Sequence, residues 1–391
     1  MSKRARVGRL RTLCWSALVL AGAASAADPA AKPAAPAGLL TENVVLIVPD
    51  GIRWQEVFTG AEKALLNDRE GGSWLDEQTL LQRFWRDDVA ERRKLLFPFL
   101  WGTVASQGQI FGNKTAGSSA RVTNPHAFSY PGYNELITGF GDPRIDSNDF
   151  GPNPNLTVFE WLNSQPDLRG RVAVHATWGA FHDIFNQPRS GLHVSAGPRL
   201  KTGTLTPRDE WLNEMIATTT MLDADDLYNS FTQMAVLDYV RQAGPRVLFI
   251  GYGETDSWSH SGRYDLVLTA AQQADRFIEQ LWNTMQSMPQ YRGKTTFIIT
   301  TDHGRGSGPV DWKEHGTEWP GSEDIWIAVI GPDTPALGER RNVPAVTQAQ
   351  VAATIAALLG RDYNRVAPKA GPPLADVIAA PATERQRARA H

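Results

Sequence analysis

Three apolar segments of this sequence are each followed by side chains that can bind a metal ion. Each segment is rich in Val and Ile and lacks polar alternation, which is typical of strands buried on both faces of a sheet. In an open parallel sheet, ligands bind at the edge formed by the carboxyl ends of the strands. The segments are residues 43–49, 246–252 and 295–301, and the groups that follow them are Asp50, Asp256 with His260, and Asp302 with His303. The pattern therefore predicts a metal site at one edge of a sheet.

Short apolar runs alternate along the chain with longer amphipathic runs. This alternation predicts an α/β fold, a mostly parallel sheet flanked by helices on both faces. The expected strands are Val44–Val48, Arg171–His175, Val247–Gly251, Thr296–Thr300 and Ile325–Ile330, and the expected helices are Asn155–Ser164, Ala224–Gln242, Asp265–Gln286 and Thr347–Leu359. Leu75–Leu96 also has a helical pattern. We expect Gly112–Asn124 to form an irregular approach to the site, and residues 176–223 to form a lid or wall of a substrate pocket.

The two ends of the chain differ in composition from the rest. Residues 1–26 contain five basic residues, a short apolar stretch and Ala24-Ser25-Ala26, which together predict a cleaved secretory signal peptide. We expect an Ala/Pro-rich linker at 27–38, a single catalytic domain at 39–378 and a disordered tail at 379–391. The protein is then periplasmic or secreted, and no later apolar stretch is long enough to span a membrane.

Cleavage after residue 26 changes the charge and the cysteine content of the chain. Removing five positive charges and no negative ones changes the formal net charge from −3 to −8, and it also removes Cys14, the one cysteine. An acidic chain of this kind is a poor general binder of nucleic acid. Without a cysteine, the mature chain offers no thiolate for catalysis or metal binding.

Six residues form the predicted metal constellation. Each of them alone has an ordinary structural explanation, such as the turn that commonly follows a strand at Asp50-Gly51. The joint pattern favours a site, because three strand ends deliver carboxylate or imidazole groups to the same edge. The six are Asp50, Asp256, His260, Asp302, His303 and His315. Six ligands suit two divalent ions, and mixed nitrogen and oxygen ligands favour zinc, with manganese or iron as alternatives.

The ordered set Asp50, Asp256-x-x-x-His260, Asp302-His303 and His315 resembles the alkaline phosphatase superfamily. It is most similar to the branch of nucleotide pyrophosphatase/phosphodiesterases and phosphoglyceromutase-like periplasmic proteins, and the resemblance covers about Asn43 to Pro332. The resemblance implies that Asp256, His260 and His315 hold one metal, while Asp50, Asp302 and His303 hold the other. His315 follows His303 by only 12 residues, where the phosphodiesterase branch often has a long insertion, which suggests a trimmed substrate cap.

The same resemblance supplies a nucleophile. The run Ser129-Tyr-Pro-Gly-Tyr-Asn-Glu-Leu-Ile-Thr-Gly139 is similar to the nucleophile segment of the phosphodiesterase branch in its length and its closing Thr-Gly. Ser129 stands at the nucleophile position, where its alkoxide would also contact a metal. Pro131 favours the first turn of a helix, so Ser129 lies where a helix N-terminus stabilises anions. The alternative is that Ser129 is an ordinary N-terminal cap.

Other residues near these motifs are candidates for binding substrate. One Asn after the nucleophile segment holds a phosphoryl oxygen in the phosphodiesterase branch, and Asn148, Asn153 and Asn155 are all in range. Arg305 and Lys313 either bind substrate charge or are solvated loop residues. Trp178, His182 and Asn186 either line the pocket or pack in the core. The aromatic residues expected near the site are Tyr130, Tyr133, Trp178, Phe181, Trp258 and Trp312.

The expected function is hydrolysis of a small-molecule phosphate ester through a phosphoseryl intermediate on Ser129, with monoesters and diesters both open. One alternative is a sulfatase, whose motif C/S-x-P-x-R this chain matches except that Tyr133 replaces the Arg. The other alternative is a non-catalytic module that binds metal or carbohydrate, which the 13 Trp residues leave open.

Overall fold

The computed structural model describes residues 38–198 and 205–379. The predicted signal peptide at 1–26, the linker as far as residue 37 and the tail from residue 380 lie outside the described residues. That residues 39–378 form a single catalytic domain stays a prediction.

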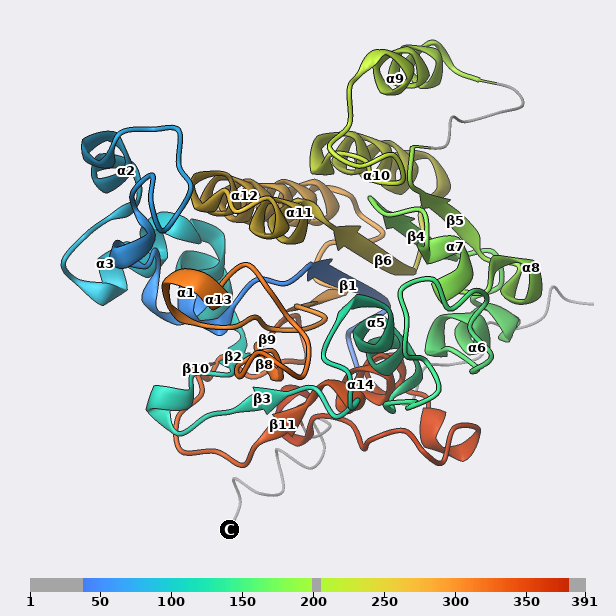
Figure 1. Ribbon diagram of the computed structural model, residues 1–391. Helices are drawn as coiled ribbons and strands as arrows, with labels where there is room; N and C mark the ends of the chain where they lie inside the picture. Colours follow the sequence, from blue (N-terminus) through green and yellow to red (C-terminus); the bar gives the residue numbers. More distant parts are fainter. Residues whose placement is uncertain (1–37, 199–204, 380–391) are drawn as a thin grey trace, which may run out of the picture. The chain divides into compact units, whose positions relative to one another are not determined.

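An eight-stranded sheet forms the centre of the described chain (Figure 1). Its strand order is β10-β2-β9-β7-β1-β6-β4-β5. The strands of this sheet are β1 (Asn43–Pro49), β2 (Gln109–Phe111), β4 (Val172–Ala176), β5 (His193–Ala196), β6 (Val247–Tyr252), β7 (Thr295–Thr300), β9 (Ile327–Ile330) and β10 (Gly338–Glu339). A second sheet, of order β11-β3-β8, contains β3 (Ala120–Arg121), β8 (Asp324–Ile325) and β11 (Val346–Thr347).

The large sheet is mostly parallel, as the sequence predicts. From β5 through β4, β6 and β1 to β7, each neighbouring pair is parallel. Strand β9 runs antiparallel to both of its neighbours, β7 and β2. Strand β1 lies between β6 and β7, with Val45 opposite Leu248 on one side and Phe297 on the other.

Helices cover both faces of this sheet. Alternate residues of a strand point to opposite faces, and along β1 the side chains of Val44 and Leu46 join one apolar cluster while those of Val45 and Ile47 join another. The first cluster includes residues of α5, α6 and α14, and the second includes residues of α1, α3, α10 and α12. These helices can be followed in Figure 1. The α/β prediction is confirmed.

The α-helices are α1 (Trp54–Thr59), α2 (Glu77–Phe84), α3 (Val89–Leu96), α4 (Ala105–Gln107), α5 (Ser129–Thr138), α6 (Val158–Ser164), α7 (Phe181–Ile184), α8 (Gln187–Ser190), α9 (Pro207–Thr218), α10 (Asn229–Ala243), α11 (Glu254–His260), α12 (Tyr264–Ser287), α13 (Gly308–Asp311) and α14 (Val351–Leu358). Short 3₁₀ segments lie at Lys63–Leu65, Lys114–Ala116, Gln348–Gln350, Tyr363–Arg365 and Ala375–Val377, and a π-helical turn lies at Leu100–Val104. Among the described helices, none combines the length and the apolar character that crossing a membrane requires.

Several expected elements have different bounds in the structure. The helix expected at Leu75–Leu96 is two helices, because the side chain of Asp88 accepts the N–H of Glu91 and begins α3 after a break. The helix expected at Asn155–Ser164 begins later, where the side chain of Thr157 caps α6. The strand expected at Ile325–Ile330 is wrong as one element, since β8 and β9 pair in different sheets. The described part of residues 176–223, where we expected a lid or wall of a pocket, contains β5, α7, α8 and α9.

Candidate metal centre and nucleophile

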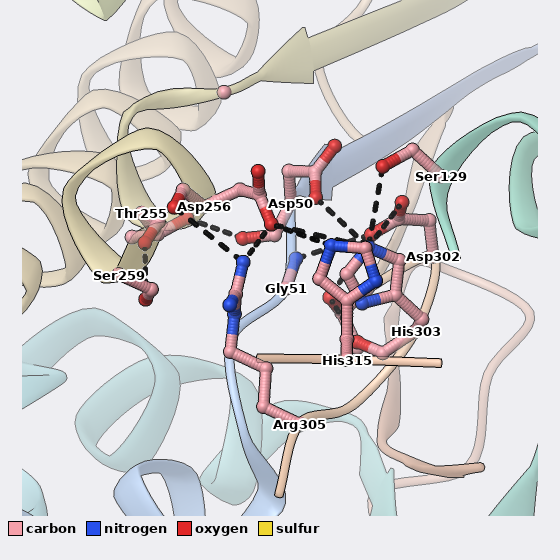
Figure 2. A network of polar contacts seen from close by, with 12 residues as sticks. Asp50, Gly51, Ser129, Thr255, Asp256, Ser259, Asp302, His303, Arg305 and His315 are labelled. Carbon is pink, nitrogen blue, oxygen red and sulfur yellow. Dashed lines mark hydrogen bonds and ion pairs between the residues drawn. The ribbon is translucent and has the colours of Figure 1, made fainter. Parts of the chain in front are cut away.

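The three strand ends that carry the predicted ligands lie side by side. Because the strand order is β7-β1-β6, Asp50 at the end of β1 lies between Asp302 and His303 after β7 and the segment after β6. Helix α11 begins two residues after β6 and carries Asp256 and His260. The fold thus brings the predicted ligands to one sheet edge, and five of them are labelled in Figure 2: Asp50, Asp256, Asp302, His303 and His315.

Asp50, Asp302 and His303 form the first group of candidate ligands. Each offers a ligand atom within 4.8 Å of those of the other two, and all three side chains are buried. Nε2 of His303 lies 3.3 Å from Oδ1 of Asp50 and 3.3 Å from Oδ2 of Asp302. Neither of these buried carboxylate oxygens accepts a hydrogen bond. Buried oxygens without donors are costly, so this donor set fits a divalent cation.

Asp256, His260 and His315 form the second predicted group, and the structure also brings these together. Nε2 of His260 lies 2.9 Å from Nε2 of His315 and 3.5 Å from Oδ2 of Asp256. His303 lies within reach of this group too, because its ring stacks on that of His315 at 4.0 Å between centroids. Two groups of carboxylate and imidazole atoms are therefore adjacent, with His303 between them.

The charges of the first group depend strongly on one another. Burial and the neighbouring Asp50 carboxylate raise the pKa of Asp302. Burial opposes the charged form of His303, but the carboxylates of Asp302 and Asp50 raise its pKa to about 9. Carboxylate and neutral imidazole are the forms that bind metals, so metal binding must displace protons from this cluster.

Ser129 is the first residue of α5 and faces the first group. Its Oγ lies 3.3 Å from Nε2 of His303. The N-cap of α5 is Phe128, which makes no side-chain capping bond, so Ser129 is not the ordinary cap of this helix. Gly132 permits the close packing of α5 on the ligand segment, since a Cβ there would meet the backbone oxygen of Asp302 at 2.4 Å.

Ser129 and four of the six candidate ligands line a cavity of about 230 Å³; the four are Asp50, Asp256, His260 and His315. Its other walls include Asn148, Thr177, Trp178, Phe181 and Asp226. A second cavity of about 270 Å³ adjoins it and shares Asn148 and Trp178. The expectation that part of residues 176–223 would line the pocket is therefore met by Thr177, Trp178, Phe181 and Asp223.

Of the residues proposed to bind substrate, some line the cavity and others are hydrogen-bonded within the fold. Asn148 lines the cavity, whereas Asn153 and Asn155 donate to the side chain of Asn134. His182 is hydrogen-bonded to Gln187, and Asn186 to the backbone of Asn153.

Of the aromatic residues expected near the site, some line a cavity and others pack in the core. Tyr133, Trp178 and Phe181 line the first cavity, and Tyr130 lines the second. Trp258 packs against the second core cluster, and Trp312 is buried against Tyr264 with 5.2 Å between ring centroids. Trp258 and Trp312 therefore lie outside the linings of the two cavities.

Arg305 has neither of its two predicted roles. It is a fully buried residue that lies outside the cavity lining, and its guanidinium forms an ion pair with Asp256 (Figure 2). Its Nη1 donates to the backbone oxygen of Lys313, 2.5 Å away. Burial lowers the pKa of Arg305 to about 9. Lys313 itself also lies outside the cavity lining.

Sequence reasoning did not single out Asp223 and Asp226, which line the cavity together with Asp50 and Asp256. Burial, together with the carboxylates of Asp50 and Asp223, raises the pKa of Asp226 to about 7. The one available signal was the acidic run Asp223-Ala-Asp-Asp226.

No protein-family model matches the chain, and no curated protein matches it. Among solved structures, the chain is similar to the alkaline phosphatase PafA, with a TM-score of 0.57 and 12% identity over 88% of this chain and 100% of that one. It is similar to a 2-O GAG sulfatase, with a TM-score of 0.50 and 13% identity over 86% and 73%. It is also similar to the lipoteichoic acid synthase LtaP from Listeria monocytogenes, with a TM-score of 0.51 and 9% identity over 83% and 73%.

At these identities the likeness concerns the fold, and it does not distinguish between branches. The similarity to the phosphodiesterase and phosphoglyceromutase-like branch stays a prediction. The chain has the fold of the alkaline phosphatase superfamily, as the ordered ligand motifs predict.

Proposed function

We propose that this protein is a metal-dependent phosphoric ester hydrolase with Ser129 as its nucleophile. One observation carries the proposal: the hydroxyl of Ser129 lies beside His303, at the junction of the two ligand groups, and opens onto the same cavity as Asp50, Asp256 and His315. The orphaned oxygens of Asp50 and Asp302 and the mixed donor set support two divalent ions, with zinc as the first choice. From the predicted signal peptide we further propose that the reaction takes place in the periplasm or outside the cell.

The reaction divides one difficult displacement into two steps. Oγ of Ser129 attacks phosphorus, the bond from phosphorus to the leaving oxygen breaks, and the alcohol departs. Water then cleaves the phosphoseryl bond and restores the hydroxyl. Bound divalent ions would supply Lewis acidity that favours the serine alkoxide and stabilises the leaving oxygen. Asn148, on the cavity wall near the start of α5, is placed to donate its amide N–H to a phosphoryl oxygen.

The cavity lining favours a phosphate diester over a monoester. Among the described residues, those that line the two adjoining cavities include no Lys or Arg, whereas they include Asp223, Asp225 and Asp226. A monoester dianion needs positive groups beyond the metals, and these carboxylates would repel it. A diester carries one negative charge, and Trp178 and Phe181 offer an apolar surface for its second substituent.

The proposal is tested by comparing three esters after metal removal and reconstitution. The chelated protein would be loaded with zinc or manganese and offered bis-p-nitrophenyl phosphate, p-nitrophenyl phosphate and p-nitrophenyl sulfate. We expect metal-dependent release of p-nitrophenolate, fastest from the diester. Turnover of the sulfate alone would establish the sulfatase alternative. Metal-loaded protein that turns over none of the three would favour the non-catalytic alternative.

A further inference from the structure

Each carboxylate of the candidate metal centre has one oxygen that is held by a donor from another part of the chain. The second oxygen of Asp50 and of Asp302 has no donor. In Asp256, Oδ2 lies 3.5 Å from Nε2 of His260, while Oδ1 also lies 3.6 Å from Nε2 of His315. Oδ2 of Asp50 accepts the phenol proton of Tyr133 at 2.7 Å, Oδ1 of Asp302 accepts the N–H of Gly51 at 3.1 Å, and Oδ1 of Asp256 accepts from Nη2 of Arg305. The donor of Gly51 is a backbone N–H, which a substitution cannot remove. The donors that a substitution can remove are the side chains of Tyr133 and Arg305.

We propose that Tyr133 and Arg305 are positioning residues that fix which oxygen of Asp50 and of Asp256 binds a metal. The inference rests on the proposed metal-dependent function, and it assigns one side-chain donor to each ligand group. Tyr133 leaves Oδ1 of Asp50 for the group that contains Asp302 and His303. Arg305 holds Oδ1 of Asp256 and leaves Oδ2 on the side of His260.

The surroundings of Tyr133 fix the direction of its hydroxyl. Tyr133 lies one helical turn after Ser129, so both side chains leave the same face of α5. Its ring is buried and meets Phe181 edge to face at 4.6 Å and Phe249 at 6.1 Å between centroids. The free oxygen of Asp50 then lies 3.3 Å from Nε2 of His303. Helix α5 therefore delivers the nucleophile and, one turn later, the donor that orients a ligand.

Arg305 is fixed at both ends of its guanidinium. Nη1 donates to the backbone oxygen of Lys313 at 2.5 Å, and Nη2 pairs with Asp256. Gly51 covers the pair, since a Cβ there would meet Nε of Arg305 at 2.9 Å and Oδ1 of Asp256 at 3.1 Å. The free oxygen of Asp256 lies 3.5 Å from Nε2 of His260. A donor that is fixed at both ends decides which oxygen of Asp256 remains free, because a charge-assisted hydrogen bond to guanidinium is strong and directional.

Hydrogen bonds to ligating side chains set their orientation, and losing such a partner typically weakens metal binding by about 10- to 100-fold. Tyr133 contacts the first ligand group and Arg305 contacts the second. Replacing Tyr133 should therefore weaken the binding of one metal ion, and replacing Arg305 should weaken the binding of the other. This selectivity separates a positioning role from a general loss of stability, which would weaken both sites together.

The test measures zinc affinity directly, by competition with a chromogenic chelator, on metal-free full-length protein. We expect two zinc ions per wild-type chain. Tyr133→Phe should weaken one of them by about 10- to 100-fold, and Arg305→Met should weaken the other by a similar factor. Arg305→Lys keeps the charge but not the two-ended fork, so its loss should be smaller. If Arg305→Met does not fold, Arg305→Lys decides the case for Arg305.

Two control variants match these changes away from the site. Tyr363→Phe removes a buried hydroxyl that donates to the backbone oxygen of Leu156 at 2.7 Å. Arg92→Lys replaces a buried Arg that donates to the backbone oxygen of Thr59 at 2.7 Å. Both should keep wild-type affinity for both zinc ions, whatever they do to the unfolding midpoint of the metal-free protein.

The outcomes distinguish this inference from the function on which it rests. A wild type that binds no divalent metal would contradict the proposed function itself. A wild type that binds two zinc ions, with both affinities unchanged in Tyr133→Phe and Arg305→Lys, would overturn the positioning role and leave the function standing. Lower kcat in Tyr133→Phe with unchanged zinc affinity would also overturn it, because Tyr133 lines the cavity and would then act on substrate.

Discussion

Oγ of Ser129 lies 3.3 Å from Nε2 of His303, although 174 residues separate the two in the chain. The contact joins the first residue of α5 to the segment that follows β7. It depends on Gly132, whose missing side chain lets the helix approach the backbone oxygen of Asp302. Nucleophile and ligand are thus held by the packing of a helix against a strand end.

Replacing Ser129 by Ala should remove turnover while leaving metal binding intact. Without the hydroxyl no phosphoseryl intermediate can form, and we expect a loss of kcat of about 1,000-fold or more. Steady-state assays and trapping of phosphorylated protein by mass spectrometry check this, with zinc content measured beside them. Ser164→Ala, at an exposed position of α6, is the control. Retained phosphorylation in Ser129→Ala would assign the nucleophile to another residue.

Gly51 tests how tightly the site is packed. Its φ of +59° is unfavourable for Ala, and an added Cβ would meet Arg305 and Asp256. Gly170 has a φ of +72° with nothing within 4 Å, so Gly170→Ala reports the backbone strain alone. We expect both variants to lose about 1 kcal/mol of unfolding free energy for the left-handed conformation, measured by urea titration. Gly51→Ala should lose more and should also bind zinc more weakly; equal zinc affinity in the two variants would contradict this.

Asp226 should weaken the binding of anionic substrates at alkaline pH. Its pKa of about 7, raised by burial and by Asp50, leaves it mostly ionised at pH 8 and mostly protonated at pH 6. Asp226→Asn should therefore lower KM for p-nitrophenyl phosphate at pH 8 by roughly 3- to 10-fold, and the difference should shrink at pH 6. The control is Asp362→Asn on the surface. Identical KM ratios at both pH values would show that Asp226 does not act through its charge.

Asp275 in α12 should make stability depend on pH. Its carboxylate accepts the N–H groups of Phe99 and Leu100, yet burial raises its pKa to about 7. Between about pH 4 and pH 7 the unfolded chain releases this proton while the folded chain keeps it, so the unfolding free energy falls as pH rises, by up to about 1.4 kcal/mol per unit. The contribution is largest below about pH 4.

Asp275→Asn lacks this ionisation, so wild-type stability should fall relative to the variant between pH 5 and pH 7. Urea unfolding at several pH values measures the difference, with the exposed Asp376→Asn as the control. Parallel pH profiles for wild type and Asp275→Asn would mean that the carboxyl group of Asp275 ionises normally in the folded protein.

Local patterns predicted the parts of the fold that depend on local forces. The strands at β1, β6 and β7 and the long helix α12 follow from buried runs and helical spacing, which neighbouring residues determine. The run Ile325–Ile330 is equally apolar throughout, but β8 pairs with β3 while β9 pairs with β7 and β2. Hydrophobicity alone does not say which sheet a buried residue joins, so the break within this run could not be predicted.

Some residues of the candidate site could also be predicted from the sequence, and others could not. The ligands could be proposed because they directly follow strands, whose ends meet at one edge in any parallel sheet. The bond from Tyr133 to Asp50 spans 83 residues, and Asp226 lines the cavity from a loop with no spacing signal. Arginine is usually a surface residue, and Arg305 is buried because its guanidinium pairs with Asp256. Such relationships arise from tertiary packing and have no local signature.

The place of β1 between β6 and β7 has a consequence for how this protein can change over time. Asp50, Asp302 and His303 closely follow strands in the interior of the sheet, so opening the centre would require unfolding the core. The wall of the cavity, in contrast, comes from residues 177–181 and 223–226, whose replacement need not disturb those strands. New substrate preferences can therefore arise by exchange of this wall while the chemistry beneath it is inherited unaltered.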